Sequence, residues 1–261
     1  MNFKQIIKTV LYSLSLIIFI LSCQDKNATI SSSSLNKING IYKYKEKSFT
    51  GLVLDTTKAG RVLLTFNCVD GKVDGEHLRY HKENGNLKQR TTYQNGKKTG
   101  PYIELTKDGG NIITGNYLDY KKSGEWKEFY NNGNIKSEGY YENGLKTGEW
   151  KFFFYNGNLK TAGSYLTRNE PKPGKTGIPK QVRSGIWKFY FEDTGKLKQE
   201  SAFQNGAITG KSVSYYPNGK IEIIANLKNN QYHGTVEFYD RSGKLEEKRI
   251  YKNDKLIENK K

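Results

Sequence analysis

Residues 124–148 read Gly-Glu-Trp-Lys-Glu-Phe-Tyr-Asn-Asn-Gly-Asn-Ile-Lys-Ser-Glu-Gly-Tyr-Tyr-Glu-Asn-Gly-Leu-Lys-Thr-Gly. Within this stretch Ile135 and Tyr141 are six residues apart. An even spacing places two side chains on the same face of a strand, whereas on a helix they would lie far apart around the axis. Asn132-Gly133 and Asn143-Gly144 separate the strand segments, and Asn-Gly is the strongest short signal for a hairpin turn because both residues tolerate positive φ. The stretch therefore predicts a β-hairpin.

The same pattern recurs along most of the chain. An opening glycine returns every 24 or 25 residues, with one longer step between Gly148 and Gly185. In each unit a second glycine is followed two residues later by an aliphatic position and six further on by a usually aromatic one. The opening glycines are Gly51, Gly75, Gly100, Gly124, Gly148, Gly185, Gly210 and Gly234; the paired positions are Val62/Cys68, Leu87/Tyr93, Ile112/Leu118, Ile135/Tyr141, Leu159/Tyr165, Leu197/Phe203, Ile221/Leu227 and Leu245/Tyr251. A fixed period in this range is typical of a repeat array.

Composition agrees with a thin sheet of short strands. Hydrophobic residues make up 35% of the 261 residues, aromatic residues reach 13%, and glycine occurs 27 times. We predict an all-β protein, an elongated single-layer meandering antiparallel sheet of about eight hairpins over residues 39–261. Lys and Arg number 43 against 26 Asp and Glu, a formal net charge of +17. The excess excludes an acidic-tail protein and favours attraction to anionic lipid headgroups.

The first 22 residues differ from the rest. Lys4 and Lys8 precede the apolar run from Val10 to Leu21, as in a secretory signal peptide. The run is short for a membrane span, which needs about 20 apolar residues. Ile20-Leu21-Ser22-Cys23 resembles the lipobox of bacterial lipoproteins, which implies that Cys23 receives a diacylglyceryl group and becomes the mature N-terminus. Residues 23–38, which include four consecutive serines, are expected to form a flexible tether.

The repeat itself resembles a known family. Residues 124–148, together with the repeated openings Gly148-Glu-Trp-Lys and Gly185-Ile-Trp-Lys, are similar to the MORN repeat variant of bacterial proteins, including the YwqK-like proteins labelled as antitoxins. The resemblance covers residues 51–261 and is weakest in the first unit. It implies a curved or twisted single-layer sheet of hairpins, and it implies little chemistry because the motif is architectural.

Three tryptophans follow their opening glycines by two residues and are each followed by lysine: Trp126-Lys127, Trp150-Lys151 and Trp187-Lys188. If side chains alternate strictly, the rings form an exposed ladder with one step per hairpin, about 9.5 Å apart. Such a ladder could bind a peptide, a glycan or another protein. Alternatively, a bulge turns the rings inward, or they pack on one another to shield a thin sheet.

The long fifth unit contains an insertion near residues 168–181. It holds Pro171, Pro173 and Pro179 with Lys172 and Lys175. Because proline lacks the N–H that a strand pair requires, we expect this segment to leave the ladder and protrude as a loop. Lys172 and Lys175 are candidate binding residues, since loops often carry function.

No catalytic constellation stands out from the periodic background. His77 and His81 lie about 13 Å apart on one strand, too far to share a metal, and are interpreted as exposed polar residues. Cys68 is interpreted as a small buried hydrophobe. We therefore expect no enzyme activity, no metal and no cofactor, and export argues against a nucleic-acid partner.

The sequence favours a lipid-anchored, extracytoplasmic scaffold of the bacterial cell envelope that binds an unknown protein. The alternative is an antitoxin or immunity protein that neutralises a cognate toxin.

Overall fold

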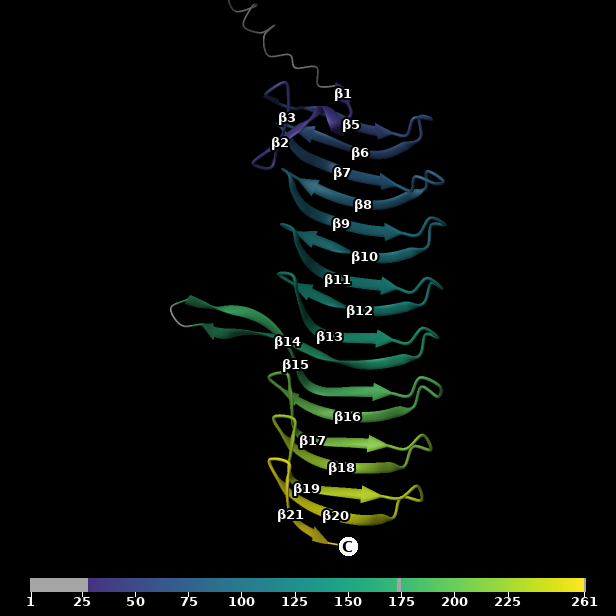
Figure 1. The fold of residues 1–261 in the computed structure, drawn as a ribbon, viewed down its shortest axis with the longest axis vertical. Coiled ribbons are helices and arrows are strands. Elements are labelled where there is room, and N and C mark those ends of the chain that lie inside the picture. Colours follow the sequence, from purple (N-terminus) through teal and green to yellow (C-terminus); the bar gives the residue numbers. More distant parts are fainter. Residues whose placement is uncertain (1–27, 173–174, 261) are drawn as a thin grey trace, which may run out of the picture. The chain divides into compact units, whose positions relative to one another are not determined.

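The computed structural model describes residues 28–172 and 175–260 (Figure 1). In these ranges every element is a β-strand except one 3-10 turn, η1. The chain divides into two compact units, the first ending at Thr99 and the second beginning at Gly100. The prediction of an all-β protein built as an antiparallel meander is confirmed.

The first unit contains two sheets. Strands β5 to β8 form an antiparallel meander, and β1 pairs in parallel with β5. Strands β2, β3 and β4 form a small separate sheet, so residues 39–48, expected to begin the array, are not a repeat. The elements are β1 (Thr29–Ile30), η1 (Ser32–Ser34), β2 (Asn36–Ile38), β3 (Ile41–Tyr44), β4 (Lys47–Ser48), β5 (Gly51–Thr56), β6 (Val62–Val69), β7 (Lys72–Tyr80) and β8 (Leu87–Gln94).

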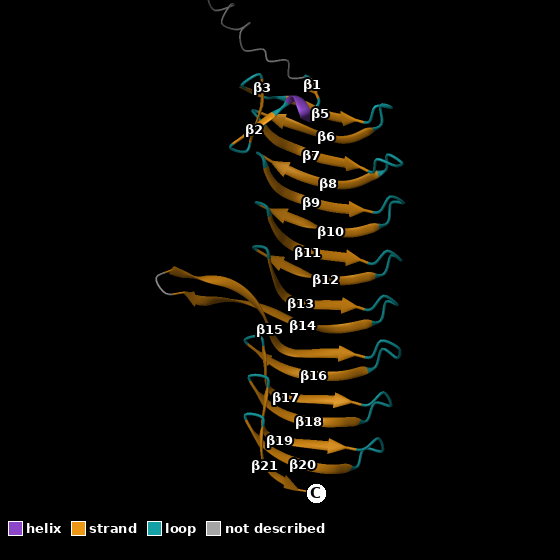
Figure 2. Ribbon diagram, viewed as in Figure 1, coloured by secondary structure: helices purple, strands orange, loops and turns teal. Residues whose placement is uncertain are grey.

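The second unit is a single-layer meander in which each strand pairs antiparallel with the next (Figure 2). Its strands are β9 (Lys97–Leu105), which begins just before Gly100, β10 (Asn111–Leu118), β11 (Lys121–Phe129), β12 (Ile135–Glu142), β13 (Leu145–Phe153), β14 (Leu159–Lys172), β15 (Lys175–Tyr190), β16 (Leu197–Gln204), β17 (Ala207–Tyr215), β18 (Ile221–Lys228), β19 (Gln231–Tyr239), β20 (Leu245–Lys252) and β21 (Lys255–Lys260).

The Asn-Gly pairs serve two different turns. At one end of the strands Asn143-Gly144 forms a two-residue turn with φ of 52° and 83°, the left-handed pair that a tight hairpin requires. At the other end Asn132-Gly133 lies in a longer loop, where only the glycine has positive φ. The Asn-Gly pair therefore does not distinguish the two-residue turn from the longer loop.

The longer loops bond to one another from hairpin to hairpin. The side-chain amides of Asn132 and Asn134 both donate to the Tyr155 carbonyl, at 2.9 and 3.0 Å. Asn156 and Asn158 repeat the arrangement toward Glu192 in the following loop. These bonds give the asparagines a structural role beyond the turn itself.

The stripe assigned to the third unit is shifted by one residue. Asn111 pairs with Leu105, just as Ile135 pairs with Phe129, so Asn111 and Tyr117 occupy the positions expected for Ile112 and Leu118. Leu118 is 57% exposed. The two adjacent glycines, Gly109 and Gly110, caused the error, because a one-residue slip exchanges the faces of a strand.

The part of the expected tether that the structure describes, residues 28–38, is ordered. Ser31 and Ser32 hydrogen-bond the carboxylate of Asp55 on β5, with the Ser32 amide at 2.8 Å. Partial burial raises the pKa of Asp55, but the hydrogen bonds from Ser32 and Ser31 outweigh it and hold that pKa below its ordinary value. The tether prediction is therefore wrong for residues 28–38, which pack on the first unit.

The insertion is strand rather than irregular loop. Strands β14 and β15 continue their pairing from Tyr165–Arg183 through Asn169–Pro179 and form a hairpin that projects from the sheet (Figure 1). We call residues 166–181 the arm. The expectation that it protrudes is met, whereas the expectation that its prolines end the ladder is wrong.

The first unit has a small core. Phe49, Val53, Phe66, Cys68 and Val73 are all buried and pack together. Burial raises the pKa of Cys68 to about 11, so its thiol stays protonated and unreactive at neutral pH. The interpretation of Cys68 as a small buried hydrophobe is confirmed.

Candidate functional site

Six of the opening glycines lie within strands at register shifts, namely Gly75, Gly124, Gly148, Gly185, Gly210 and Gly234. Gly124 has φ of 69°, and around it the pairing of β10 with β11 jumps from Thr114–Lys127 to Asn116–Ser123. A left-handed glycine at such a bulge reorients the side chains that follow it. The residue two positions after the glycine is consequently buried in most units, as for Val53, Tyr102, Trp126, Trp150, Trp187, Ser212 and Val236.

Each tryptophan ring covers a glycine of the preceding strand. A Cβ added at Gly115, Gly139 or Gly163 would overlap the ring of Trp126, Trp150 or Trp187, respectively. The indole Nε1–H then donates to the carbonyl of the residue after that glycine, Asn116, Tyr140 or Ser164, at 3.0, 3.0 and 3.1 Å. Glycine is required here because any side chain would occupy the space of the ring.

The rings form a continuous row across β9 to β16. Tyr141 packs edge-on against Trp126 and Trp150, with ring centroids 5.8 and 5.1 Å apart, and Tyr165 contacts Trp150 and Trp187 in the same way. We call the set the aromatic row; it comprises Tyr102, Tyr117, Trp126, Tyr141, Trp150, Phe152, Tyr165, Trp187 and Phe203. The row replaces the second layer that would normally bury a sheet face.

The sequence left open whether the three tryptophan rings are exposed or buried, and in the structure they are buried. Trp126 and Trp150 are 2% exposed and Trp187 is 0% exposed, so an exposed tryptophan ladder is absent and the bulge does turn the rings inward. Such rings can contact a ligand only after the surrounding side chains move.

The lysines that follow the tryptophans do not join them. Lys127 lies on the opposite face, where its ammonium contacts the carboxylates of Glu125 at 3.0 Å and Glu138 at 3.8 Å. Lys151 is the cross-strand neighbour of Glu138, and Lys188 that of Glu200. Lys127 is thus ion-paired, and Lys151 and Lys188 each lie opposite a glutamate, so the predicted combined Trp-Lys site does not form.

The cations on the tryptophan face are different residues. The Lys122 and Lys146 ammonium groups stand 4.2 and 4.1 Å over the rings of Trp126 and Trp150, and the Arg183 guanidinium stands 4.4 Å over Trp187. Each cation lies two residues before its opening glycine. That position is basic in four of the eight units, the fourth residue being Lys98. The sequence alone does not show that the charge contacts a buried ring.

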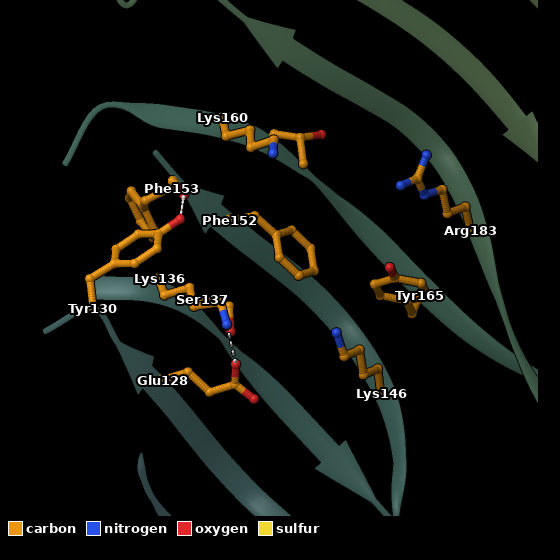
Figure 3. A pocket seen from close by; sticks show the side chains of 11 residues that line it. Glu128, Tyr130, Lys136, Ser137, Lys146, Phe152, Phe153, Lys160, Tyr165 and Arg183 are labelled. Carbon is orange, nitrogen blue, oxygen red and sulfur yellow. Dashed lines mark hydrogen bonds and ion pairs between the residues drawn. The ribbon is translucent and has the colours of Figure 1, made fainter. Parts of the chain in front are cut away.

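A groove of about 350 Å³ lies over the centre of the row (Figure 3). Four basic side chains and one carboxylate line it, together with aromatic rings and hydroxyl groups. Its lining residues are Glu128, Tyr130, Lys136, Ser137, Lys146, Phe152, Phe153, Lys160, Thr161, Tyr165 and Arg183. Burial lowers the pKa of Lys146, against an opposing effect of Glu128. This groove is the candidate binding site.

His77 occupies the tryptophan position of the second unit. Its ring stacks on Phe66 at 5.1 Å and contacts Tyr93 at 5.8 Å, so the interpretation as an exposed residue is wrong. Burial, assisted by the charge of Arg79, lowers the pKa of His77 to about 4. In the described residues no group of three or more His, Cys, Asp or Glu side chains is placed to hold a metal ion.

We expect the first unit to lose stability as the pH falls from 6.5 toward 4. Over this window the unfolded chain binds a proton at His77 that the folded chain excludes, so the free energy of unfolding decreases with falling pH. The His77→Phe variant should show a flatter dependence. Urea unfolding at several pH values checks this, and equal slopes for both proteins would contradict it.

Some predicted positions lie outside what the structure describes. Cys23 and the signal segment precede residue 28, and the side chains of Lys172 and Lys175 are likewise outside the description. Among the residues that are described, no helix has the length and apolar character needed to cross a membrane.

Comparison with known proteins identifies the repeat. A family model described as MORN repeat variant matches residues 122–143, 146–166, 208–229 and 232–253, about a third of the chain. No curated protein matches. The matched segments coincide with the hairpins β11–β12, β13–β14, β17–β18 and β19–β20. These four hairpins of the second unit are therefore similar to repeats of the MORN variant type.

Proposed function

We propose that this chain is a non-enzymatic, lipid-anchored scaffold of the bacterial cell envelope that binds a protein partner. MORN repeats support a binding module, and the lipobox-like sequence ending at Cys23 supports the anchor. The observation that carries the proposal is the arm, the one hairpin of the described array that extends well beyond the repeat.

The arm has the properties of a contact element. Leu166 and Ile178 are 55% and 50% exposed, although aliphatic side chains on a strand normally pack against a neighbour. Basic residues Arg168 and Lys180 lie opposite each other on the same two strands. The register places this basic pair between Leu166 and Ile178 along the arm, which suits a protein surface with acidic residues flanked by apolar ones.

Shortening the arm should abolish partner capture without unfolding the array. The variant replaces residues 168–180 with Asn-Gly and keeps Gln181, whose Oε1 accepts the Lys146 amide hydrogen at 2.8 Å. Proteins crosslinked to the intact chain in whole cells are compared with those crosslinked to the variant. Leu118→Asp, at a similarly exposed position away from the arm, is the control.

A protein retained by the parent chain and by Leu118→Asp but lost from the short-arm variant supports the proposal. If that protein is a toxin, the scaffold is an immunity protein. Identical crosslinking profiles for all three chains, with unchanged melting temperatures, would eliminate the arm as the contact element.

Cys23→Ala should abolish lipid attachment. Without the thiol no thioether to diacylglycerol can form, so the chain should lose metabolic fatty-acid labelling and leave the membrane fraction. Labelling followed by fractionation measures both effects, with Cys68→Ala as the matched control. Undiminished labelling of Cys23→Ala would refute the anchor.

A further inference from the structure

Two of the four cations of the groove, Lys146 and Arg183, are held in place without ion pairs. Lys146 contacts the rings of Trp150 at 4.1 Å and Phe152 at 4.7 Å, and Arg183 lies over Trp187 at 4.4 Å. Among the described residues neither has a carboxylate within 4.0 Å, in contrast to Lys127 on the opposite face. Both are half-buried. They are therefore oriented and partly dehydrated before any ligand arrives, which lowers the cost of binding an anion.

The single carboxylate of the groove belongs to Glu128. It lies 3.9 Å from the Lys136 ammonium, to which a dashed line joins it in Figure 3. In the same view Lys146 and Arg183 flank the rings of Phe152 and Tyr165. The carboxylate of the groove is thus paired with Lys136 and not with Lys146 or Arg183.

The cations recur at a fixed interval across the strands. Lys122, Lys146 and Arg183 lie on β11, β13 and β15, and in each case one strand intervenes. Two strand spacings amount to about 9.5 Å. A matching ligand is linear, runs perpendicular to the strands, and carries an anionic group at a similar interval.

The groove offers nothing to a peptide backbone. It lies on the face of the sheet, where the N–H and C=O groups of β12 to β15 are already paired with neighbouring strands. A peptide placed here would cover its own backbone groups without gaining partners. The lining instead offers acceptors for sugar hydroxyls, namely the carboxylate of Glu128 and the hydroxyl oxygen of Thr161, whose own hydrogen is donated to the Lys188 carbonyl.

We propose that this groove binds a linear acidic polysaccharide of the uronic acid type, with its carboxylates on Lys146 and Arg183 and the next one on Lys122. The rings of Phe152 and Tyr165 contact the apolar faces of the sugars between those carboxylates. None of the residues that line the groove belongs to the arm, so the two proposals are tested by different variants and either can fail without the other.

The test measures binding of polygalacturonate oligomers to the full-length chain in non-ionic detergent, at about 0.15 M salt. The double variant Lys146→Gln/Arg183→Gln removes two charges from the groove. Lys151→Gln/Lys188→Gln removes two charges from the opposite face of the same hairpins. We expect the first pair to weaken binding about tenfold or more, as for the loss of charge-assisted hydrogen bonds, and the second pair by less than about twofold.

Three further probes test the ligand class. Neutral dextran oligomers of equal length should not bind. Poly-glutamate and vesicles containing anionic lipid should bind the parent chain more weakly than polygalacturonate does. Each of these two probes should also bind the two double variants with equal affinity. Lys146→Arg, which keeps the charge, should retain most of the affinity, and melting curves confirm that each variant is folded. Equal losses for the two double variants, no binding of polygalacturonate, or stronger groove-dependent binding of poly-glutamate or vesicles would each overturn the proposal.

Discussion

Gly139→Ala is expected to destabilise the second unit by about 3 kcal/mol, the upper part of the range for an overpacked site. The added Cβ would overlap the five-membered ring of the Trp150 indole, whose Nε1–H donates to the Tyr140 carbonyl and over which the Lys146 ammonium stands. The ring therefore has no free space into which it can move. Urea unfolding monitored by tryptophan fluorescence measures the loss.

Gly110→Ala is the control for the effect that replacing a glycine by alanine has on stability in the absence of a steric overlap. Its Cβ would meet only the Thr106 hydroxyl at 3.4 Å, and its φ lies outside the left-handed region. This change should alter stability by less than about 1 kcal/mol. Adding Trp150→Leu to Gly139→Ala should cost less than the sum of the two single changes, because the smaller side chain relieves the overlap. Strict additivity would show that the ring and the glycine do not compete for the same space.

Trp150→Ala is expected to cost about 3 to 5 kcal/mol of stability. The ring is 2% exposed, contacts Tyr141, Phe152 and Tyr165, and supports the Lys146 ammonium. Its removal opens a cavity in a sheet that has no second layer to collapse into it. Chemical denaturation of the parent and variant chains provides the measurement.

Tyr140→Ala is the matched aromatic control, since that ring is 56% exposed on the neighbouring strand. It should be nearly neutral. Partner capture by Trp150→Ala should decrease only in proportion to its unfolded fraction. A fully stable Trp150→Ala that fails to capture its partner would instead restore the tryptophan as a contact residue.

The sequence was sufficient to predict the hairpins, because a period-two pattern between Asn-Gly turns has no helical counterpart. It was insufficient to predict which face of the sheet each side chain occupies. Register shifts beside Gly124, Gly148 and Gly185 break strict alternation, and nothing in the local pattern shows how a bulge directs the next side chain. The Gly109-Gly110 pair likewise left two registers open, which only pairing with β9 decides.

The candidate site was missed for a related reason. Trp126-Lys127 is adjacent in sequence, whereas Lys122 and Trp126 come together only because the strand bulges between them. The arm was expected to be irregular because of its prolines. Yet Pro179 pairs with Asn169 in a hairpin that leaves the sheet, where a missing N–H disturbs no third strand.

The bonds between successive long loops constrain how such a chain can change length. In each case the Asn132-type donor lies in one loop and its acceptor, such as the Tyr155 or Arg241 carbonyl, lies in the next loop. A duplicated or deleted segment that spans one whole hairpin regenerates this donor and acceptor at its junctions, wherever its cut points lie. A segment of any other length leaves an amide or a carbonyl without its counterpart and reverses the strand direction or its faces. Gene rearrangements that survive should therefore add or remove whole hairpins, so such chains should differ in length by whole repeats. Insertions of any other length should occur at the two-residue turns at the opposite end of the strands, as the arm does.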